Sequence, residues 1–456
     1  MYKVAFITAK KRDPKYLFQT SGVDLSSLAL EAYLSARGKN IETLVSEEVS
    51  DIIRYRPDLV AITATSENYP LAIRIAKSVK ENTGARAVIG GAHISSLPSS
   101  IDPVFDAGVI GEGEETLLEL VNFFSGNQKL DASIMSSIRG IVYRDKDDVF
   151  VTPPRSAISD LGLLPLPNRK KWVSKIGMAY LMTARGCNFR CTFCAACRFW
   201  GGGVRFFPVG HVISEIKDIA ENFKPKAIRI FDDIFTLNKE RVREIISRLK
   251  SEGLSHSISY ICWSRADLID EDYVKLLKEG NFVYVAFGVE SASERIMKEL
   301  KGEGMSLKKV ERAIALLKGA GINVGLTFIL GTPGEKDEDM QATYDFIARH
   351  KDEILDIELN PLIAFPGTPI WDEAKKGGLV SDDMDWERLS DTGVITTFDF
   401  NNYIYLNPAM PFDRFMAWIE RFKLLYMEVM TKREVFEFRS KTFPSYIFPS
   451  RLKRLP

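Results

Sequence analysis

The sequence predicts an α/β protein in which two parallel sheets follow one another along the chain, before a mostly helical C-terminal tail. Short apolar runs alternate with amphipathic stretches over residues 1–125, and the same alternation starts again near Met178. A proline-containing segment separates the two series. Strands that alternate with helices form parallel sheets covered by those helices. A chain of 456 residues is also long enough for two domains.

The composition is that of a globular protein without a strong overall charge. Hydrophobic residues make up 45% of the chain and charged residues 27%, which is typical of folded domains. Lys and Arg together number 61, as do Asp and Glu, so we expect no nucleic-acid partner. The first residues lack the apolar run of a signal peptide, and no stretch reaches the ~18 apolar residues of a membrane helix. These features predict a cytoplasmic protein and leave its oligomeric state open.

Residues 1–138 are predicted to form a doubly wound, Rossmann-like domain. Its expected elements follow the two periodicities of buried strands and helices. The strands are Val4–Thr8, Leu59–Thr65 and Ala87–Ile89, and the helices are Leu25–Ala36 and Leu71–Glu81. Such a sheet binds its ligand beyond the carboxyl ends of its strands. Two glycine-rich turns, 90–93 and 111–115, fall at those ends and predict a ligand site, although each could also be an ordinary tight turn.

A connector over residues 139–176 is predicted to separate the two domains. It begins with a short hairpin that pairs Ile141–Tyr143 with Val149–Thr152, and it continues through four prolines. Prolines at this density interrupt helices and strands and mark an exposed link.

Residues 177–375 are predicted to form a partial (β/α)6 barrel that is open on one side. Six candidate strands alternate with amphipathic helices such as Val209–Phe223, Lys239–Glu252 and Leu307–Gly319. The candidate strands are Ala179–Thr183, Ala227–Phe231, Ser257–Ile261, Phe282–Phe287, Asn323–Ile329 and Ile354–Asn360. The active groups of such barrels lie at the carboxyl ends of the strands.

The tail, residues 376–456, is rich in aromatic side chains and is predicted to be mostly helical, with one amphipathic helix over Pro411–Phe436. We expect this helix to pack against the barrel. Arg414, Arg421 and Lys423 accompany its apolar residues, which leaves docking on a lipid surface as an alternative.

The cysteines predict a metal site rather than disulfides. Four of the five lie between residues 187 and 197, and a clustered, odd set of this kind is typical of metal ligands. Cys187, Cys191 and Cys194 can wrap one loop around an iron–sulfur cubane, because iron readily accepts thiolates. Three ligands for four irons leave one iron open for catalysis. A zinc knuckle completed by Cys197, or a redox dithiol, is the alternative, and Cys262 is expected in the core.

The cysteine loop resembles that of the radical S-adenosylmethionine superfamily, whose signature is Cys-x3-Cys-x2-Cys after the first barrel strand. Cys187, Cys191 and Cys194 match it, with Phe193 in the usual aromatic position. The resemblance implies a [4Fe–4S] cluster whose fourth iron is chelated by S-adenosylmethionine. It also implies reductive cleavage of S-adenosylmethionine to a radical that abstracts hydrogen from a substrate. A second triad, in which Cys197 replaces Cys187, also has ligand-like spacing.

Further segments in barrel order resemble the cofactor contacts of this superfamily. The contacts to S-adenosylmethionine that the resemblance implies are Asp232 and Asp233 after the second strand, Arg265 after the third, Glu290 and Ser291 at the fourth and Gly331 after the fifth. Carboxylates can accept from ribose or an amine, an arginine can pair with a carboxylate, and a glycine lets the backbone approach adenine. The Gly-Gly-Glu segment that many members carry after the second strand is absent. Asp232 or Asp233 is expected to replace it.

Residues 1–125 resemble the cobalamin-binding domain that precedes the radical barrel in one large subfamily. The contacts that this resemblance implies are Thr63, Thr65, Ser66, Gly90, Gly91, His93, Gly111, Glu112 and Gly113. The Asp-x-His-x-x-Gly signature of histidine ligation to cobalt does not occur, so we expect cobalamin without a protein histidine on cobalt. A domain that has kept the fold and lost the cofactor is the alternative.

Together the two resemblances imply an enzyme that methylates an unactivated carbon of a small-molecule, lipid or peptide substrate. The cofactors would supply the chemistry, and the protein would position them and exclude water. An electron donor of the flavodoxin or ferredoxin type and an anaerobic setting are expected with it. The alternatives are a cobalamin-associated cyclase or rearrangement enzyme, a cobalamin-free radical dehydratase, epimerase or deoxygenase, and, outside enzymes, an iron–sulfur electron carrier or sensor.

Overall fold

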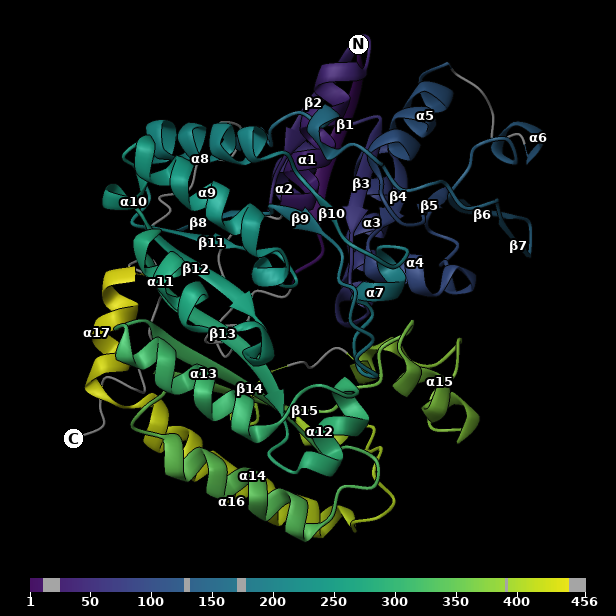
Figure 1. Ribbon diagram of the computed structural model, residues 1–456. Coiled ribbons are helices and arrows are strands. Elements are labelled where there is room, and N and C mark those ends of the chain that lie inside the picture. Colours follow the sequence, from purple (N-terminus) through teal and green to yellow (C-terminus); the bar gives the residue numbers. More distant parts are fainter. Residues whose placement is uncertain (11–24, 127–131, 170–177, 390–392, 443–456) are drawn as a thin grey trace.

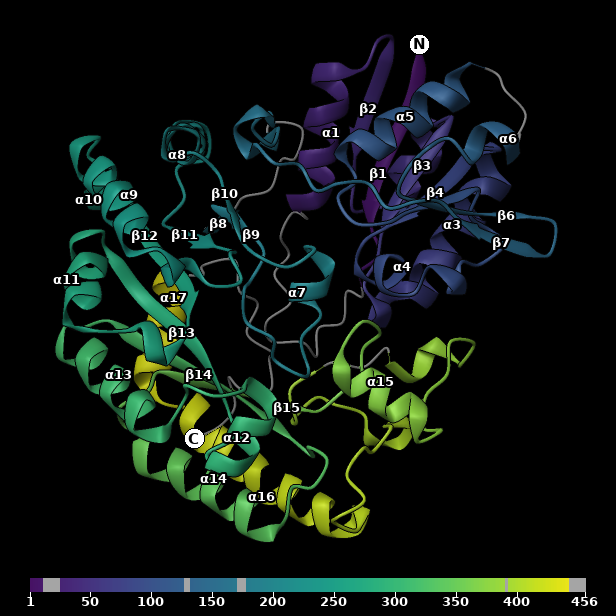
Figure 2. The same ribbon diagram turned by 45° about the vertical axis from the view of Figure 1, so that its right-hand side comes forward.

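Two parallel sheets with their covering helices lie side by side (Figure 1). The computed structural model describes residues 1–10, 25–126, 132–169, 178–389 and 393–442. The N-terminal sheet is coloured purple to blue, and the larger second sheet is coloured teal to green. The last helices, in yellow, border the second sheet. The turned view in Figure 2 shows the loop around α7 (Ala196–Phe199) between the two sheets.

The N-terminal sheet has the strand order β2-β1-β3-β4-β5-β6-β7. Its strands are β1 (Tyr2–Thr8), β2 (Ile41–Val45), β3 (Leu59–Thr63), β4 (Arg86–Gly90), β5 (Ala107–Val109), β6 (Ile141–Asp145) and β7 (Asp148–Val151). The first five are parallel, whereas β6 and β7 run antiparallel at one edge. The predicted parallel sheet is confirmed, and the three strands predicted from their apolar runs are β1, β3 and β4.

Helices cover both faces of this sheet, as a doubly wound fold requires. One face packs against α1 (Leu25–Arg37) and α5 (Glu114–Ser125), and the other against α2 (Val49–Tyr55), α3 (Tyr69–Thr83) and α4 (Ala92–Ser96). Because side chains alternate along a strand, β1 sends Val4 and Phe6 to the first core and Ala5 and Ile7 to the second. The short helix α6 (Ala132–Met135) follows α5.

The hairpin predicted within the connector extends the N-terminal sheet. Strand β6 pairs with β5, with Gly108 opposite Val142. Val142 is fully buried in one of the two cores of this domain, so apolar side chains of the hairpin complete the core. The N-terminal unit therefore runs to Val151. The rest of the connector is anchored by Arg169, whose buried guanidinium donates to Glu215 of α8 (Val209–Phe223) at 2.5 Å.

The second sheet has six parallel strands in the order β15-β14-β13-β12-β11-β8. They are β8 (Met178–Leu181), β11 (Ala227–Ile230), β12 (Ser259–Ser264), β13 (Phe282–Glu290), β14 (Asn323–Leu330) and β15 (Asp356–Pro361). In the described part of the chain β8 and β15 do not pair with each other, so the predicted partial barrel, open on one side, is confirmed. A small hairpin of β9 (Ala184–Arg185) and β10 (Arg205–Phe206) follows the first strand.

Helices pack on the outer face of this sheet. They are α8, α9 (Lys239–Ser251), α10 (Leu254–Ser257), α11 (Glu271–Glu279), α12 (Glu294–Lys301), α13 (Leu307–Gly319) and α14 (Asp337–His350). Helix α15 (Pro369–Lys376) lies apart from them, in an apolar cluster of its own. On β11, Ile228 and Ile230 enter the large core beneath the helices, whereas Arg229 points to the inner face. Side-chain caps fix where some helices begin: Asp270, for example, accepts a hydrogen bond from Tyr273 N at 2.9 Å.

The tail forms two helices where the sequence predicted one. Helix α16 (Phe412–Met430) ends at Thr431, and α17 (Arg433–Thr442) starts after Lys432. The amphipathic pattern continues across the break, which is why it was not visible in the sequence. Lys432 Nζ donates to the Lys351 and Ile354 carbonyls, and this contact holds the break beside the end of α14. The predicted packing of α16 on the barrel is confirmed by its buried residues in the barrel core.

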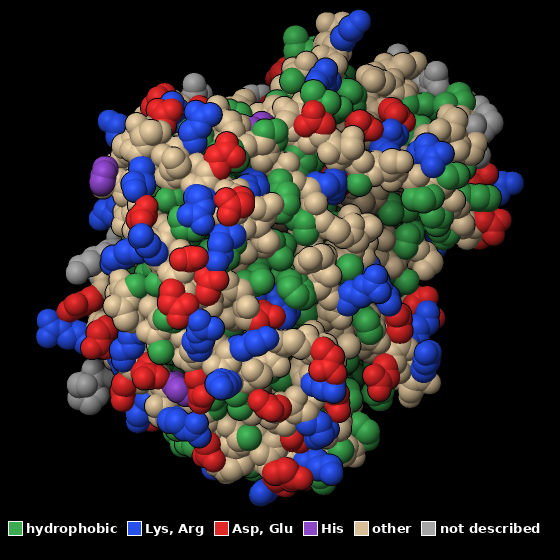
Figure 3. Space-filling view, in the orientation of Figure 1, with side chains coloured by type: hydrophobic (Ala, Val, Ile, Leu, Met, Phe, Trp, Pro, Cys, Tyr) green, Lys and Arg blue, Asp and Glu red, His purple; other side chains and the backbone are tan. Residues whose placement is uncertain are grey.

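Another part of the tail reaches the N-terminal domain. The 3-10 turn Trp386–Leu389 places the Trp386 ring 4.7 Å from that of His93, and Glu387 pairs with Arg74 at 2.6 Å. Basic and acidic side chains are interspersed over the face shown in Figure 3. Among the helices that the structure describes, none combines the length and apolarity needed to cross a membrane.

A buried carboxyl group supports the turn that follows β14. Glu335 is 1% exposed and accepts hydrogen bonds from Gly331 N at 2.7 Å and Thr332 N at 3.1 Å. Its other oxygen, Oε1, is buried without a hydrogen-bond partner. Burial raises the pKa of Glu335 to about 8, against the opposing effect of the two backbone hydrogen bonds.

Glu335 should therefore make stability depend on pH. Its pKa lies above the ordinary value of 4.5, so its contribution is fully present below about pH 4.5 and is lost as the pH rises towards 8. Glu335→Gln keeps an acceptor oxygen and cannot ionise. We expect the variant to be more stable than the wild type at pH 8, by on the order of a few kcal/mol, and similar at pH 5, in urea unfolding. The control is Glu338→Gln on the exposed face of α14, and an equal pH dependence of Glu335→Gln and wild type would contradict this assignment.

Candidate active site between the two domains

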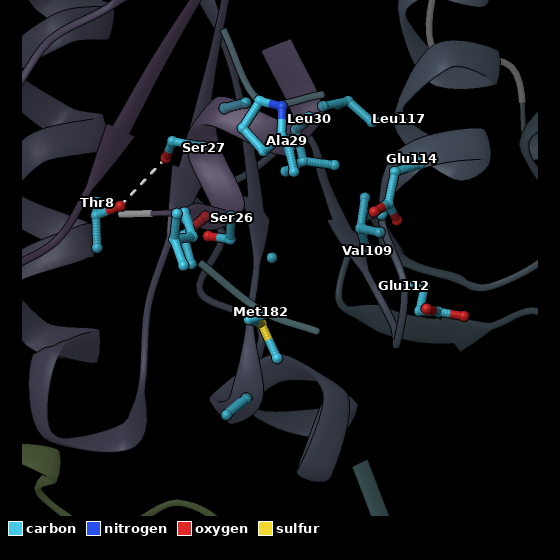
Figure 4. A pocket seen from close by; sticks show the side chains of 18 of the residues that line it. Thr8, Ser26, Ser27, Ala29, Leu30, Val109, Glu112, Glu114, Leu117 and Met182 are labelled. Carbon is cyan, nitrogen blue, oxygen red and sulfur yellow. Dashed lines mark hydrogen bonds between the residues drawn. The ribbon is translucent and has the colours of Figure 1, made fainter. Parts of the chain in front are cut away.

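A cavity of about 640 Å³ lies between the carboxyl edge of the N-terminal sheet and the barrel. Residues after β1, β3, β4 and β5, together with α1 and α5, line one side. Residues of β8 and α8 line the other, with Arg185 before the cysteine loop and Phe199 and Trp200 after it; Cys187, Cys191 and Cys194 are not among the lining residues. Figure 4 shows Thr8, Ser26 and Ser27 on one wall and Glu112 and Glu114 on another, with a 3.2 Å hydrogen bond between the Thr8 and Ser27 hydroxyl groups. This volume is within the range of sites that bind small molecules and cofactors.

Most residues predicted to contact cobalamin line this cavity. They are Thr63, Thr65, Gly90, Gly91, Gly111, Glu112 and Gly113. Gly111 has a φ of +76°, and a Cβ atom there would meet nothing within 4 Å, so the turn needs glycine for its backbone and opens onto free space. At Gly90 a Cβ atom would meet only Val109 Cβ, at 3.9 Å. These glycines leave a floor that a flat ligand can approach closely.

Ser66 and His93 do not line the cavity, contrary to the prediction. His93 is 0% exposed, and its two ring nitrogens contact Ser66 Oγ at 3.0 Å and Ser100 Oγ at 2.9 Å. The ring stacks on Tyr69 at 4.0 Å and meets Trp386 edge-on. Burial lowers the pKa of His93 to about 3, so the ring is neutral at ordinary pH. Its role is to hold α4 and the tail against the domain.

Part of the cavity wall is apolar and comes from α1, β2, β5 and α5. Leu30, Val45, Val109 and Leu117 form it. The hydroxyl groups of Thr8, Ser26 and Ser27, which also line the cavity, can form hydrogen bonds with the polar edges of a ligand. The aliphatic side chains suit a flat aromatic ring system. The glycines and this apolar wall fit cobalamin, whose corrin is flat and whose tail carries an aromatic base.

The three signature thiols share one electrostatic neighbourhood at the carboxyl end of the barrel. The charges of Cys187 and Cys191 both act on Cys194, and Cys191 also acts on Cys187; Cys197 is not among the main influences on any of them. Burial raises the pKa of all three thiols, and that of Cys194 to about 11. Cationic groups oppose this, because Lys301 and Arg265 lower the pKa of Cys191.

This environment fits an iron–sulfur cluster. Thiols must lose their protons to bind metal, and the two cations favour the thiolate form. In the described part of the chain no three His, Cys, Asp or Glu side chains stand in the arrangement of a metal-holding group. The support for ligation is therefore the spacing of the three thiols and their common surroundings.

Asp232 and Asp233 take different positions after β11. Asp232 is 3% exposed and accepts hydrogen bonds from Thr183 N, Thr183 Oγ1 and Ala184 N at 2.5, 2.5 and 3.1 Å. Burial raises its pKa to about 6. Its carboxylate therefore fixes the turn that leads into the cysteine loop. Asp233 is exposed, and its charge raises the pKa of Cys187 and Cys194, which places it beside the thiols.

Arg265 and Glu290 also lie near the thiols, each with a partner. Arg265 forms two hydrogen bonds with Asp267, both 3.0 Å, and its guanidinium lies 3.7 Å from the ring centre of Phe189 in the cysteine loop. Glu290 has a left-handed backbone, with φ at +67°, at a register shift in β13, and its carboxylate accepts from buried Lys301 at 2.9 Å. Strained backbone of this kind is often found at functional sites.

The remaining predicted residues of the barrel face other parts of the structure. Ser291 is 0% exposed, and its hydroxyl lies 3.3 Å from that of Thr343 in α14. Phe193 packs against the apolar cluster around α15. At Gly331, which has a φ of +85°, a Cβ atom would approach the Phe415 ring at 3.1 Å, so the turn requires glycine.

Two family models match this chain. The radical SAM superfamily matches residues 181–347, and the B12 binding domain matches residues 18–121. A protein of Pyrococcus horikoshii named as an uncharacterized methyltransferase is 34% identical over 366 residues, which make up 76% of this chain and 76% of that protein. The chain belongs to the cobalamin-binding radical S-adenosylmethionine enzymes.

Other relatives agree with this membership. Cytidylyl-2-hydroxyethylphosphonate methyltransferase from Streptomyces wedmorensis is 28% identical over 64% of this chain and 62% of that protein. The solved structure of the methyltransferase TsrM from Kitasatospora setae, with cobalamin and a [4Fe–4S] cluster bound, has a TM-score of 0.68 at 19% identity, over 83% of this chain and 75% of that chain. The likeness confirms the fold. As a member of its family, the radical enzyme uses a [4Fe–4S] cluster, S-adenosylmethionine and cobalamin.

A buried ion network joins the two domains of this radical enzyme. Arg185, two residues before the first signature cysteine, donates from Nη1 to Glu112 and from Nη2 to Glu114, both at 2.5 Å. Glu112 also accepts from Arg205 at 2.8 Å and from Ile158 N at 2.8 Å. The side chains of Arg185, Glu112 and Glu114 are each at most 9% exposed. Both oxygens of Glu112 are therefore engaged by protein groups at the wall of the cavity.

This network cannot be recognised in the sequence. The two glutamates stand in the glycine-rich turn and Arg185 stands beside the cysteine loop, so each element was visible. Their pairing was not, because Glu112 and Arg185 are 73 residues apart and belong to different domains. The arginines and glutamates stabilise each other's charged forms. Despite burial, the pKa of Glu112 is lowered by Arg205 and Arg185, and that of Arg185 is raised by Glu114 and Glu112.

Removing one charge from this network should weaken the interface between the domains. Glu112→Gln leaves Arg205 and part of Arg185 buried without a counter-charge, so we expect the free energy of unfolding to fall by about 3 kcal/mol. Glu115→Gln is the matched control, because Glu115 is 47% exposed in its ion pair with Arg155. Urea unfolding followed by circular dichroism measures both. Equal stability of Glu112→Gln and the control would show that the network does not stabilise the fold.

Proposed function

We propose that this enzyme transfers a methyl group from S-adenosylmethionine to a carbon atom of a substrate bound between the two domains. The observation that carries the proposal is the single cavity whose walls include both the glycine turns of the cobalamin-binding domain and Arg185 beside the cysteine loop. The methyltransferase names of relatives from Pyrococcus horikoshii and Streptomyces wedmorensis support the same reaction.

The chemistry belongs to the cofactors: S-adenosylmethionine on the cluster supplies a hydrogen-abstracting radical, and cobalamin carries the methyl group. The residues of the chain would bind and orient these cofactors and shield them from water. Cys187, Cys191 and Cys194 would hold the cluster, leaving one iron open. Arg265 stacks on the loop that carries them and favours their thiolate form.

Residues around the open iron would bind S-adenosylmethionine. Asp233 is exposed beside the thiols and can accept hydrogen bonds from an amine. Lys301 and Glu290 form a buried pair next to Cys191, where a carboxylate and a ribose hydroxyl could replace part of that pairing. The rings of Phe199 and Trp200 line the cavity beside the loop and would exclude water from the reacting groups.

A radical cyclase that also uses cobalamin is the second candidate. Anaerobic magnesium-protoporphyrin IX monomethyl ester cyclase from Rubrivivax gelatinosus is 26% identical over 92% of this chain and 74% of that protein. Such a reaction would use the same cavity without transferring a methyl group. A cytoplasmic location, an anaerobic setting and a flavodoxin- or ferredoxin-type electron donor belong to the proposal in either case.

The proposal is tested by following the methyl group. The reconstituted enzyme is reduced anaerobically with S-adenosylmethionine deuterated in its methyl group, and the cobalamin is then extracted and weighed by mass spectrometry. Methyl transfer predicts a deuterated methyl group on cobalamin. Unlabelled cobalamin together with abundant 5′-deoxyadenosine would overturn the proposal in favour of the cyclase.

The ligand assignment makes its own prediction. Cys191→Ala should abolish reductive cleavage of S-adenosylmethionine and lower the iron content from about four per chain, because the cluster loses one of its three ligands. Cys197→Ala is the control and should keep most cleavage and its iron. Quantifying 5′-deoxyadenosine and iron measures both. Loss of cleavage and iron in Cys197→Ala as well as in Cys191→Ala would contradict the assignment and favour the triad in which Cys197 replaces Cys187.

Filling the cavity should lower the cobalamin content of the enzyme without lowering its iron content. Ser26 is exposed at the start of α1 and lines the cavity, so Ser26→Trp places an indole where cobalamin would lie. We expect cobalt to fall well below about one per chain while iron stays near about four. Ala36→Trp, at the exposed far end of the same helix, is the control. Full cobalt content in Ser26→Trp would place cobalamin outside this cavity.

A further inference from the structure

An arginine on the inner face of the barrel stands behind the wall of the cavity. Arg229 is the third of the four residues of β11 and lies opposite Tyr180 of β8 in the sheet register. Its strand neighbours Ile228 and Ile230 point to the helices on the outer face, so its own side chain points inward. Tyr180 and Phe231 line the cavity, and both adjoin Arg229.

Among the residues that the structure describes, none forms an ion pair with Arg229. Within the described residues its guanidinium makes no hydrogen bond or ion pair, and Nε is buried without a partner. Its contacts are aromatic: the guanidinium carbon lies 5.0 Å from the ring centre of Phe231 and 5.6 Å from that of Trp263. A buried arginine donor without an acceptor is costly, which indicates that a ligand supplies the acceptor.

The nearby acidic side chains are engaged with other groups. Asp356 accepts a hydrogen bond from Tyr284 Oη at 2.7 Å, on the inner face of the same sheet. Glu358 has an interaction of its own. Neither forms an ion pair with Arg229 in the described structure, although both act electrostatically on Tyr284 together with it. The guanidinium therefore remains available on the inner face.

The aromatic side chains around Arg229 indicate which shape of ligand would bind beside the guanidinium. Phe231 is 48% exposed, which is unusual for a large apolar side chain, and its ring meets that of Tyr180 edge-on at 5.6 Å. Exposed aromatic side chains beside a cation suit a planar ring that stacks on them while an anionic group reaches the cation.

We propose that Arg229 binds an anionic group of the substrate and that this substrate is a planar aromatic acid. This inference rests on the proposed function in one respect only, namely that the molecule bound by Arg229 is the substrate that is methylated. A carboxylate or a phosphonate would take the Arg229 donors in a two-pronged hydrogen bond, with the ring against Phe231 and Trp263. The rest of the ring would then extend towards the cavity.

Binding of simple probes tests this assignment. The probes are indole-3-acetate, phenylphosphonate and the uncharged indole-3-acetamide, titrated into the reconstituted holoenzyme and followed by calorimetry. We expect wild type to bind the two acids at least about tenfold more tightly than the amide. Arg229→Gln should remove that difference, and Arg229→Lys should keep part of it. Preference for one acid distinguishes a carboxylate from a phosphonate substrate.

A control variant and the cofactor content of each variant distinguish the loss of a binding group from misfolding or incomplete cofactor binding. Arg243→Gln removes an arginine from the half-exposed face of α9 and should bind like wild type. Iron and cobalt contents show whether each variant has folded and loaded. Equal affinity of wild type and Arg229→Gln for the acids, equal affinity for acid and amide, or no binding of either acid to wild type would overturn the proposal. Failure of the labelling experiment above would refute methyl transfer and leave these binding results standing.

Discussion

The arrangement of the site depends on the buried contact between Arg185 and the two glutamates of the cobalamin-binding domain. Removing charges from water is costly, so such a network is stable only when the partners meet with good geometry and few unmet hydrogen bonds. Here the partners come from different domains, and Arg185 is two residues from Cys187. The same contact therefore ties the glycine-rich turn of the N-terminal domain to the loop that carries the signature cysteines.

Each sheet contributes its carboxyl edge to the space between the domains. In the N-terminal sheet, glycines at that edge leave room for a flat ligand. In the barrel, buried Asp232 holds the turn before the cysteine loop through three hydrogen bonds, and Arg265 supports the loop itself. The residues that the sequence predicts as ligand contacts thus form two groups. Some line the space between the domains, and others hold the turns and loops around it.

The sequence predicted the fold and the cysteine loop well, because both rest on local signals. Alternating apolar runs located all six barrel strands, and the cysteine spacing matches the radical SAM family model that covers this loop. Predictions that needed the direction of a side chain were weaker. His93 and Ser66 stand in the right segments yet bond each other inside the domain, and the break at Thr431 interrupts an amphipathic pattern that continues across it. Pairings across domains, such as Arg185 with Glu112, have no local signal at all.

The proposed function requires the two cofactors to lie close to each other between the two domains, and magnetic resonance tests this most directly. The reconstituted enzyme is prepared with its cluster reduced and its cobalamin in the paramagnetic Co(II) state, and electron paramagnetic resonance spectra are recorded with both cofactors and with each alone. Close approach of the cofactors predicts that the spectrum of the doubly loaded enzyme shows splitting or broadening from spin–spin interaction. A spectrum equal to the sum of the two single-cofactor spectra would contradict it.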